Sequence, residues 1–238
     1  MIFPSLDRVK AIAPGYDIVP VYMEILSDVR TPISVLKALK QVSSHTYLLE
    51  SADNSNHWGR YSFLGYDPKI ELFCKNHKMT IKDGTTRTFE CSDPAAEIRN
   101  ILSQYKSPRL EELPTFTGGF VGYFACEYIR YIEPTLDFPT PDDDSAMVND
   151  VDLMLFDKVI AFDHYKNKIY LIANISTNDL ERNYNKAELE LKALADLVVN
   201  GKEADIPKGI LKTEFTSEFT KDEFEAVVKK TQHYIKEG

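Results

Sequence analysis

The side chains best suited to bind a charged ligand lie in one segment, residues 47–65, with the sequence YLLESADNSNHWGRYSFLG. Glu50 and Ser51 end a predicted strand, and Arg60 opens the next one after a polar loop. A carboxylate binds an ammonium and a guanidinium binds a carboxylate through charge-assisted hydrogen bonds, and a hydroxyl can donate or accept. The three groups suit a zwitterionic ligand. A surface salt bridge beside a structural loop is the alternative, and it is the commoner arrangement.

The sequence contains no recognisable catalytic set. It has no GxSxG, no HExxH and no phosphate-binding loop. Gly118, Gly119 and Gly122 form GGxxG rather than the GxGxxG of a dinucleotide site, and no acidic residue follows at the required distance. No acidic residues have the spacing of a metal loop. We therefore expect neither catalytic residues nor a metal site in this chain.

Composition narrows the class of protein. The 238 residues are 43% hydrophobic and 27% charged, as in a soluble globular protein. The net charge of −9 argues against a nucleic-acid partner, because phosphate binding needs excess lysine and arginine. Three dispersed cysteines without a CxxC pair predict reduced thiols and a cytoplasmic location. No signal peptide or bilayer-length apolar run is visible, so we expect no membrane association.

The elements that position these residues follow from hydrophobic periodicity and turn signals. Residues 60–90 read as an antiparallel meander, with tight turns at Asn76-His77 and Asp83-Gly84. Thr220 and Glu223 form a capping box that opens a helix to residue 236. The other expected helices are 5–12, one that begins at 31–32, 94–105 and 178–200, and the other expected strands are 17–26, 45–50, 120–125, 153–162 and 168–175.

Several separated motifs resemble one family. They are LLES at 48–51, WGRYSFLG at 58–65, LPTFTGGFVGYFACEYIR at 113–130 and LMLFDKVIAFDHYKNKIYLIAN at 153–174. Together they are similar to the amino-terminal domain of anthranilate synthase component I, a chorismate-utilising enzyme. The final segment, FTKDEFEAVVKKTQHYIKEG at 219–238, resembles the first helix of that family's chorismate-binding domain. The resemblance covers nearly the whole chain in order.

The resemblance implies an α+β fold with antiparallel β-sheets packed face to face and flanking helices. It divides the chain into an amino-terminal domain at 1–201, a linker at 202–217 and the first helix of a truncated chorismate-binding domain at 218–238. The parent enzyme would be a lyase that converts chorismate and ammonia to anthranilate and pyruvate in tryptophan biosynthesis. It would use Mg²⁺, with ligands outside this chain, and ammonia from a glutamine amidotransferase subunit. This chain alone would be inactive.

The resemblance also assigns a binding site. It implies that Leu49, Glu50 and Ser51 of the intact LLES motif, with Arg60, form part of the tryptophan feedback site. Tryptophan is a zwitterion, so it agrees with the kind of ligand that the residue types at Glu50, Ser51 and Arg60 suggest. Cys126-Glu127 stands where the family commonly has Tyr-Asp, which leaves the role of that pair open. The alternatives are a fragment of aminodeoxychorismate synthase component I and a stand-alone amino-acid-sensing module.

Overall fold

The structure is a computed structural model that spans residues 1–238 and describes all of them except 52–58, 134, 136–147 and 206–208. The chain divides into two units, Met1–Asp205 and Ile206–Gly238. The first unit holds two five-stranded sheets, which are antiparallel throughout. With its helices it has the α+β fold that the sequence predicts.

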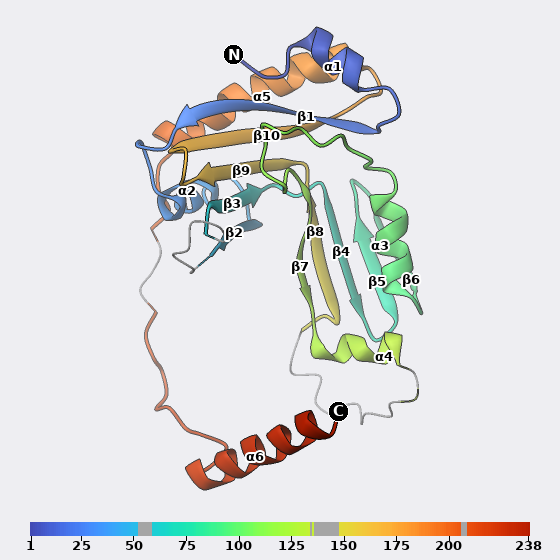
Figure 1. Ribbon diagram of the computed structural model, residues 1–238, viewed down its shortest axis with the longest axis vertical. Helices are drawn as coiled ribbons and strands as arrows, with labels where there is room; N and C mark the ends of the chain where they lie inside the picture. Colours follow the sequence, from blue (N-terminus) through green and yellow to red (C-terminus); the bar gives the residue numbers. More distant parts are fainter. Residues whose placement is uncertain (52–58, 134, 136–147, 206–208) are drawn as a thin grey trace. The chain divides into compact units, whose positions relative to one another are not determined.

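The first sheet carries the segment of interest at its edge (Figure 1). Its strands alternate residues between two apolar layers, because successive side chains point to opposite faces. Helices α1, α2 and α5 cover one face with residues such as Val9, Leu39 and Leu191. The strand order is β1 (Ile18–Leu26), β10 (Lys168–Ser176), β9 (Lys158–Asp163), β3 (Tyr61–Tyr66) and β2 (Thr46–Glu50), and the helices are α1 (Leu6–Ile12), α2 (Pro32–Leu39) and α5 (Leu180–Asn200).

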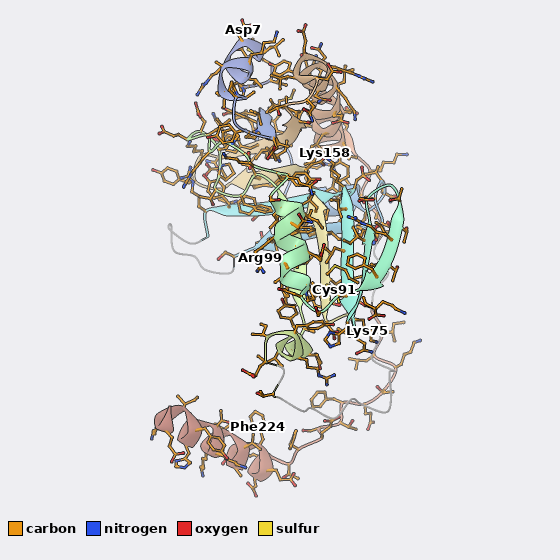
Figure 2. The ribbon with its side chains drawn as sticks, turned by 90° about the vertical axis from the view of Figure 1, so that its right-hand side faces the viewer. Asp7, Lys75, Cys91, Arg99, Lys158 and Phe224 are labelled. Carbon is orange, nitrogen blue, oxygen red and sulfur yellow. The ribbon has the colours of Figure 1, made fainter. Side chains whose placement is uncertain are left out.

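The second sheet packs one face against α3 (Pro94–Leu102), as Figure 2 shows, and Ile98 and Ile101 join its core. Asp93 caps α3, and Pro94 occupies its first turn. The predicted hairpin turn at Asn76-His77 is confirmed, and both residues have the positive φ that such a turn requires. The strand order is β6 (Thr86–Glu90), β5 (Lys78–Lys82), β4 (Ile70–Lys75), β8 (Val151–Phe156) and β7 (Gly119–Phe124).

One expected strand is in fact two strands in different sheets. The sequence indicated a continuous strand over 153–162, but β8 ends at Phe156, β9 starts at Lys158, and Asp157 alone separates them. Asn174 causes the break, since its backbone N–H and its side-chain amide donate to the Asp157 carbonyl at 2.9 and 3.1 Å. Figure 1 shows the two strands running in different directions. The charged pair Asp157-Lys158, which interrupts the apolar run over 153–162, marks this junction in the sequence.

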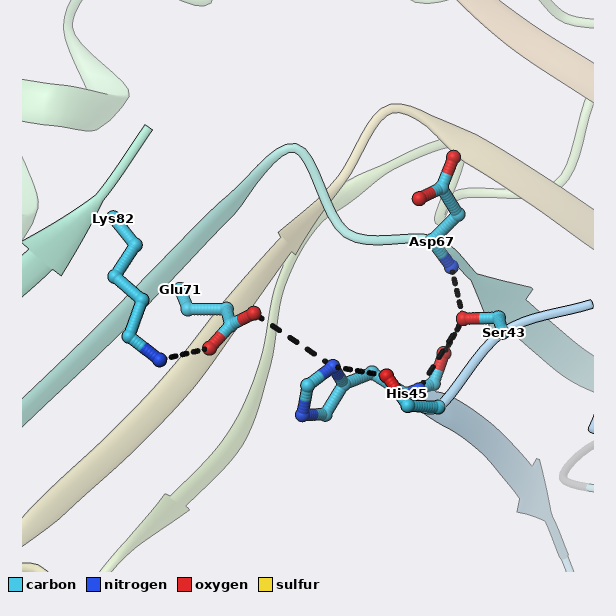
Figure 3. A network of polar contacts seen from close by, with 6 residues as sticks. Ser43, His45, Asp67, Glu71 and Lys82 are labelled. Atoms are coloured by element: carbon cyan, nitrogen blue, oxygen red, sulfur yellow. Dashed lines mark hydrogen bonds and ion pairs between the residues drawn. The ribbon is translucent and has the colours of Figure 1, made fainter. Parts of the chain in front are cut away.

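A polar network also links the two sheets (Figure 3). Beside β2, the Ser43 hydroxyl donates to the His45 carbonyl at 2.8 Å and accepts the Asp67 backbone N–H at 3.0 Å. The His45 ring lies 3.7 Å from the Glu71 carboxylate on β4, and Lys82 on β5 donates to the same carboxylate at 3.0 Å. The start of β2 is thus tied to the neighbouring sheet, away from the Glu50 end.

A short helical segment that the sequence analysis missed follows β7. It consists of a 3₁₀ turn at Cys126–Tyr128 and α4 at Ile129–Ile132. The Tyr131 hydroxyl donates to Asp150 at 2.7 Å and accepts the His77 backbone N–H at 2.9 Å. Burial raises the pKa of Tyr131, and its hydrogen bond with Cys74 adds to the effect. These long-range contacts stabilise a helix too short to be recognised by periodicity.

The second unit contains α6 (Lys221–Glu237). The predicted capping box is present: the Thr220 hydroxyl accepts the Glu223 N–H, and the Glu223 carboxylate accepts the Thr220 N–H at 2.8 Å. Phe224, Tyr234 and Ile235 are exposed on this helix. Among the residues that the structure describes, no helix is both long and apolar enough to cross a membrane.

Candidate functional site

The pairing of β2 with β3 determines where the candidate residues point. Glu50 lies opposite Ser62, and Leu49 lies opposite Phe63. Because side chains alternate along a strand, Glu50 and Leu49 point to opposite faces of the sheet. β2 is the edge strand, so both faces meet at its free edge. The loop over 52–58 that follows Ser51 lies outside the described residues.

The Glu50 side chain is exposed, and its carboxylate is hydrogen-bonded to a buried serine. The hydroxyl of Ser62, which is only 1% exposed, donates to Glu50 Oε1 at 3.3 Å. The same hydroxyl lies 2.7 Å from Nε2 of His164, which follows β9. The His164 ring stacks on Phe162, and its backbone N–H donates to the Arg60 carbonyl at 2.9 Å. Glu50 is therefore the outer member of a three-residue polar chain.

Arg60 binds a partner that the sequence analysis did not identify. Its Nε and Nη2 atoms donate to the two oxygens of Asp163 at 3.0 and 2.7 Å. Asp163 is fully buried and also accepts the backbone N–H groups of Tyr165 and Lys166 at 3.1 and 3.0 Å. Burial alone would raise the pKa of Asp163, but these hydrogen bonds, led by that from Arg60, outweigh it and lower the pKa.

The guanidinium of Arg60 is further fixed by two aromatic rings. It lies 4.8 Å from the ring centre of Tyr61 and 5.5 Å from that of Tyr165. The hydrogen bond to Asp163 raises the pKa of Arg60, so the side chain keeps its charge. The two bonds to Asp163 do not involve Nη1. A ligand carboxylate at Arg60 would approach Nη1 and the second N–H of Nη2.

Leu49 offers apolar surface on the other face of the sheet. It is 47% exposed, and its cross-strand neighbour Phe63 packs edge-on against Phe116 at 5.5 Å between ring centres. Ser51 follows directly after β2 and is exposed. The structure thus brings Glu50 and Ser51 to one end of the edge strand, with Leu49 facing away from Glu50.

Ser62, Asp163 and His164 are the site residues that sequence reasoning missed. Ser62 lies in the conspicuous WGRYSFLG motif, but its neighbours on the same face, Leu64 and Phe162, belong to the apolar core. The signal was the polar residue at an apolar position of the alternating pattern. Its partners could not be found, because pairing of β3 with β9 joins residues a hundred positions apart and depends on the break at Asp157.

A cleft of about 380 Å³ lies where β8 meets β9, and its lining includes Lys158, which Figure 2 labels. Lys158 forms an ion pair with Asp67 at 3.4 Å in this cleft, and Lys186 forms one with Glu190 at 3.5 Å. Burial raises the pKa of Asp157 at the same place. Both lysines thus have carboxylate partners, as Arg60 has in Asp163.

The GGxxG motif has a structural explanation. A Cβ atom on Gly122 would overlap the backbone oxygen of Asp152 on β8. A Cβ atom on Gly118 would approach the Phe156 carbonyl to 2.9 Å and would crowd the Asn174 amide. These glycines therefore allow β7 to pack closely against its neighbours. This requirement accounts for Gly118 and Gly122 without a nucleotide.

The described residues do not fit a divalent metal ion. Outside the undescribed segments, no group of three or more histidine, cysteine, aspartate or glutamate residues could hold one. The Mg²⁺ that the resemblance implies for the parent enzyme is therefore not assigned to any residue here. Cys74, Cys91 and Cys126 form no disulfide, and burial raises the pKa of Cys74 and of Cys91.

The chain is similar to proteins named anthranilate synthase component 1. It is 34% identical to that of Acetivibrio thermocellus, with 100% of this chain and 49% of the relative aligned, and 36% identical to that of Acinetobacter calcoaceticus, with 94% and 45% aligned. The chain is also similar to a crystal structure of anthranilate synthase component I from Streptococcus pneumoniae TIGR4, at 26% identity and a TM-score of 0.43. The aligned part is 71% of this chain and 36% of that structure's chain. The chain spans about half the length of the curated relatives it matches.

A family-level comparison covers most of the chain. The sequence pattern of the chorismate binding enzyme family matches residues 45–238. The match begins at residue 45, so it does not support the expectation that the chain stops before the chorismate-binding domain. It includes both strands of the candidate site and both units of the structure. The chain belongs to the chorismate binding enzyme family.

Proposed function

We propose that this chain is the amino-terminal, regulatory portion of an anthranilate synthase component I and carries part of a tryptophan effector site. The observation that supports this most is the Glu50 carboxylate of the intact LLES motif, which lies at the free edge of β2. The buried Ser62 hydroxyl donates a hydrogen bond to this carboxylate. The alignment of nearly the full chain with anthranilate synthase component 1 relatives supports the assignment. It favours this enzyme over aminodeoxychorismate synthase and over a stand-alone sensing module.

The effector would lie against the edge of β2. Glu50 would accept hydrogen bonds from the ammonium group, and Ser51 would bond the ligand next to it. Arg60 would bind the carboxylate through Nη1 and the second N–H of Nη2, since Nε–H and one N–H of Nη2 are bound to Asp163. Leu49 would contribute apolar contact from the opposite face. A ligand at an edge strand can reach both faces, which a ligand on a flat sheet surface cannot.

The parent enzyme would convert chorismate and ammonia to anthranilate and pyruvate, with a glutamine amidotransferase component as partner. The word "component" in the names of the relatives suggests such an assembly. Mg²⁺ would supply charge stabilisation in that reaction. The residues of this chain would act by binding the effector, which favours one conformation of the enzyme over another. We propose that this chain alone forms no anthranilate from chorismate, Mg²⁺ and ammonia.

The test is a titration of ¹⁵N-labelled chain with L-tryptophan, followed by amide NMR. We expect saturable shifts around residues 48–51, 60–62 and 163–165. Tryptamine, which lacks the carboxylate, and indole-3-propionate, which lacks the ammonium, separate the two halves of the site. Glu50→Gln should weaken tryptophan and tryptamine binding by about ten- to a hundredfold, as expected for a charged hydrogen bond, and leave indole-3-propionate unaffected. No saturable shift up to the solubility limit of tryptophan would overturn the proposal.

A further inference from the structure

The Ser62 hydroxyl has two polar neighbours and a single proton. Its oxygen lies 3.3 Å from Glu50 Oε1 and 2.7 Å from His164 Nε2. An ionised carboxylate can only accept hydrogen bonds, whereas an imidazole nitrogen can donate or accept according to its tautomer. If Ser62 gives its proton to Glu50, then the hydrogen bond to His164 must run from Nε2–H to the serine oxygen.

We propose that His164 is a positioning residue for the effector site and acts on Glu50 through Ser62. This inference rests on the proposed function, because it concerns the carboxylate that would receive the ligand ammonium. The relay runs from His164 Nε2–H to Ser62 Oγ, and from Ser62 Oγ–H to Glu50 Oε1. With the proton on Nδ1 instead, Ser62 would donate to His164 Nε2, and Glu50 would lose its support.

The surroundings of Ser62 favour a specific role. Ser62 is 1% exposed on the face that carries the apolar core residues Leu64 and Phe162. A buried hydroxyl is costly unless it is hydrogen-bonded, and here both of its bonds go to side chains of the relay. The Ser62 hydroxyl therefore provides a polar link between the core face and the exposed Glu50.

The imidazole is itself held in place. The backbone N–H of His164 donates to the Arg60 carbonyl at 2.9 Å, and the His164 ring stacks on Phe162 with an angle of 22° between the ring planes. The preceding residue, Asp163, is fixed by Arg60. Asp163 and His164 are consecutive residues at the end of β9, so Arg60 and the relay to Glu50 each have one partner in this short segment.

The first test needs no ligand and no substitution. Long-range ¹H–¹⁵N NMR of the neutral ring reports which nitrogen of His164 carries the proton. We expect the Nε2–H tautomer alone in the wild type and a mixture of tautomers in Ser62→Ala, which no longer offers the hydroxyl. A wild-type His164 with its proton on Nδ1 would overturn the relay whether or not the chain binds tryptophan.

The second test measures the effect on the ligand. Ser62→Ala and His164→Leu each remove the relay, and His164→Gln keeps an N–H donor at the end of the side chain. We expect the first two to weaken tryptophan binding by about two- to tenfold, as for one neutral hydrogen bond, and His164→Gln to restore most of it. Indole-3-propionate has no ammonium for Glu50, so its affinity should not change. His233→Leu on α6 is the matched control.

The outcomes separate this inference from the proposed function. If the wild type binds tryptophan and the Ser62 and His164 variants weaken both ligands equally, these residues are merely structural and the relay is overturned while the function stands. If the wild type does not bind tryptophan, the proposed function is overturned, and the role of the relay in an effector site falls with it. Selective loss of tryptophan binding, with rescue by His164→Gln, supports both.

Discussion

Arg60 and Asp163 form a two-point ion pair with N···O distances of 3.0 and 2.7 Å, and the carboxylate is fully buried. The pair joins the first residue before β3 to the last residue of β9. A carboxylate with both oxygens bonded holds the guanidinium in one orientation. The pair therefore has a structural role of its own, and any ligand at Arg60 would bind to a side chain that is already immobilised.

Replacing Asp163 should destabilise the fold. Asp163→Asn removes the charge that Arg60 faces. If the amide oxygen keeps the Oδ1 position that the backbone N–H groups of Tyr165 and Lys166 bond, the amide nitrogen, a donor, faces Arg60 Nη2. We expect the free energy of unfolding near neutral pH to fall by about 1.5–3 kcal/mol, the usual range for hydrogen bonds to a charged group. Urea denaturation measures this. Asp67→Asn, at an exposed pair with Lys158, is the control and should cost less than about 1 kcal/mol.

The contribution of Asp163 should depend on pH. Its pKa is lower in the folded chain than in the unfolded chain, so its stabilisation is complete above the unfolded value of about 3.9. The stabilisation is lost as the pH falls through the folded pKa. The difference in unfolding free energy between wild type and Asp163→Asn should therefore be constant near neutrality and shrink in acid. A difference that grows in acid would contradict the assignment.

Gly122→Ala should be strongly destabilising, because the new methyl group would overlap the Asp152 backbone oxygen on the adjacent strand. Separating β7 from β8 to relieve this overlap would cost about 1–3 kcal/mol or more. Gly209→Ala is the matched control, since nothing lies within 4 Å of the position of its Cβ. Thermal unfolding of the two variants tests the explanation. Equal melting temperatures would refute a packing role for Gly122.

The three thiols should differ in reactivity. Cys126 is exposed, whereas Cys74 and Cys91 are buried, and burial raises the pKa of both buried thiols. Only the thiolate is nucleophilic, so we expect one rapid equivalent with a disulfide reagent in the native chain and three after denaturation. Cys126→Ser should abolish the rapid equivalent. Rapid labelling of two or more thiols in the native chain would show that the sheet core opens readily.

Tyr131→Phe should release the turn at Asn76-His77. The change removes the hydroxyl that bonds Asp150 and the His77 N–H, and it leaves that N–H without its partner. We expect a loss of about 1–3 kcal/mol in unfolding free energy and faster hydrogen exchange at His77. Tyr165→Phe, at an exposed tyrosine, is the control. Unchanged exchange at His77 would count against the network.

Local signals in the sequence predicted most of the fold. The capping box of Thr220 and the turn at Asn76-His77 each depend on residues within a few positions, so periodicity and turn chemistry suffice to find them. The break at Asp157 depends on Asn174, which lies on another strand, and α4 depends on Asp150 and His77. Propensity alone does not contain such distant contacts.

The residues of the candidate site also differ in whether the sequence alone could reveal them. Glu50, Ser51 and Arg60 stand together in the sequence and could be proposed from residue type and from the resemblance. Asp163 and His164 could not, because only the pairing of β3 with β9 brings them to Arg60 and Ser62. The sequence indicates which groups could meet a ligand, and the sheet register determines what supports those groups.

The one-residue junction at Asp157 limits how the length of this chain can vary. Insertion of one residue between Phe156 and Lys158 would shift either β8 or β9 by one position in its sheet, and side chains such as Leu155 or Ile160 would then turn from a core toward the opposite face. The turn at Asp83-Gly84 connects neighbours in a single sheet and can accept extra residues outside it. Natural or engineered insertions should therefore be found at that turn and not at Asp157.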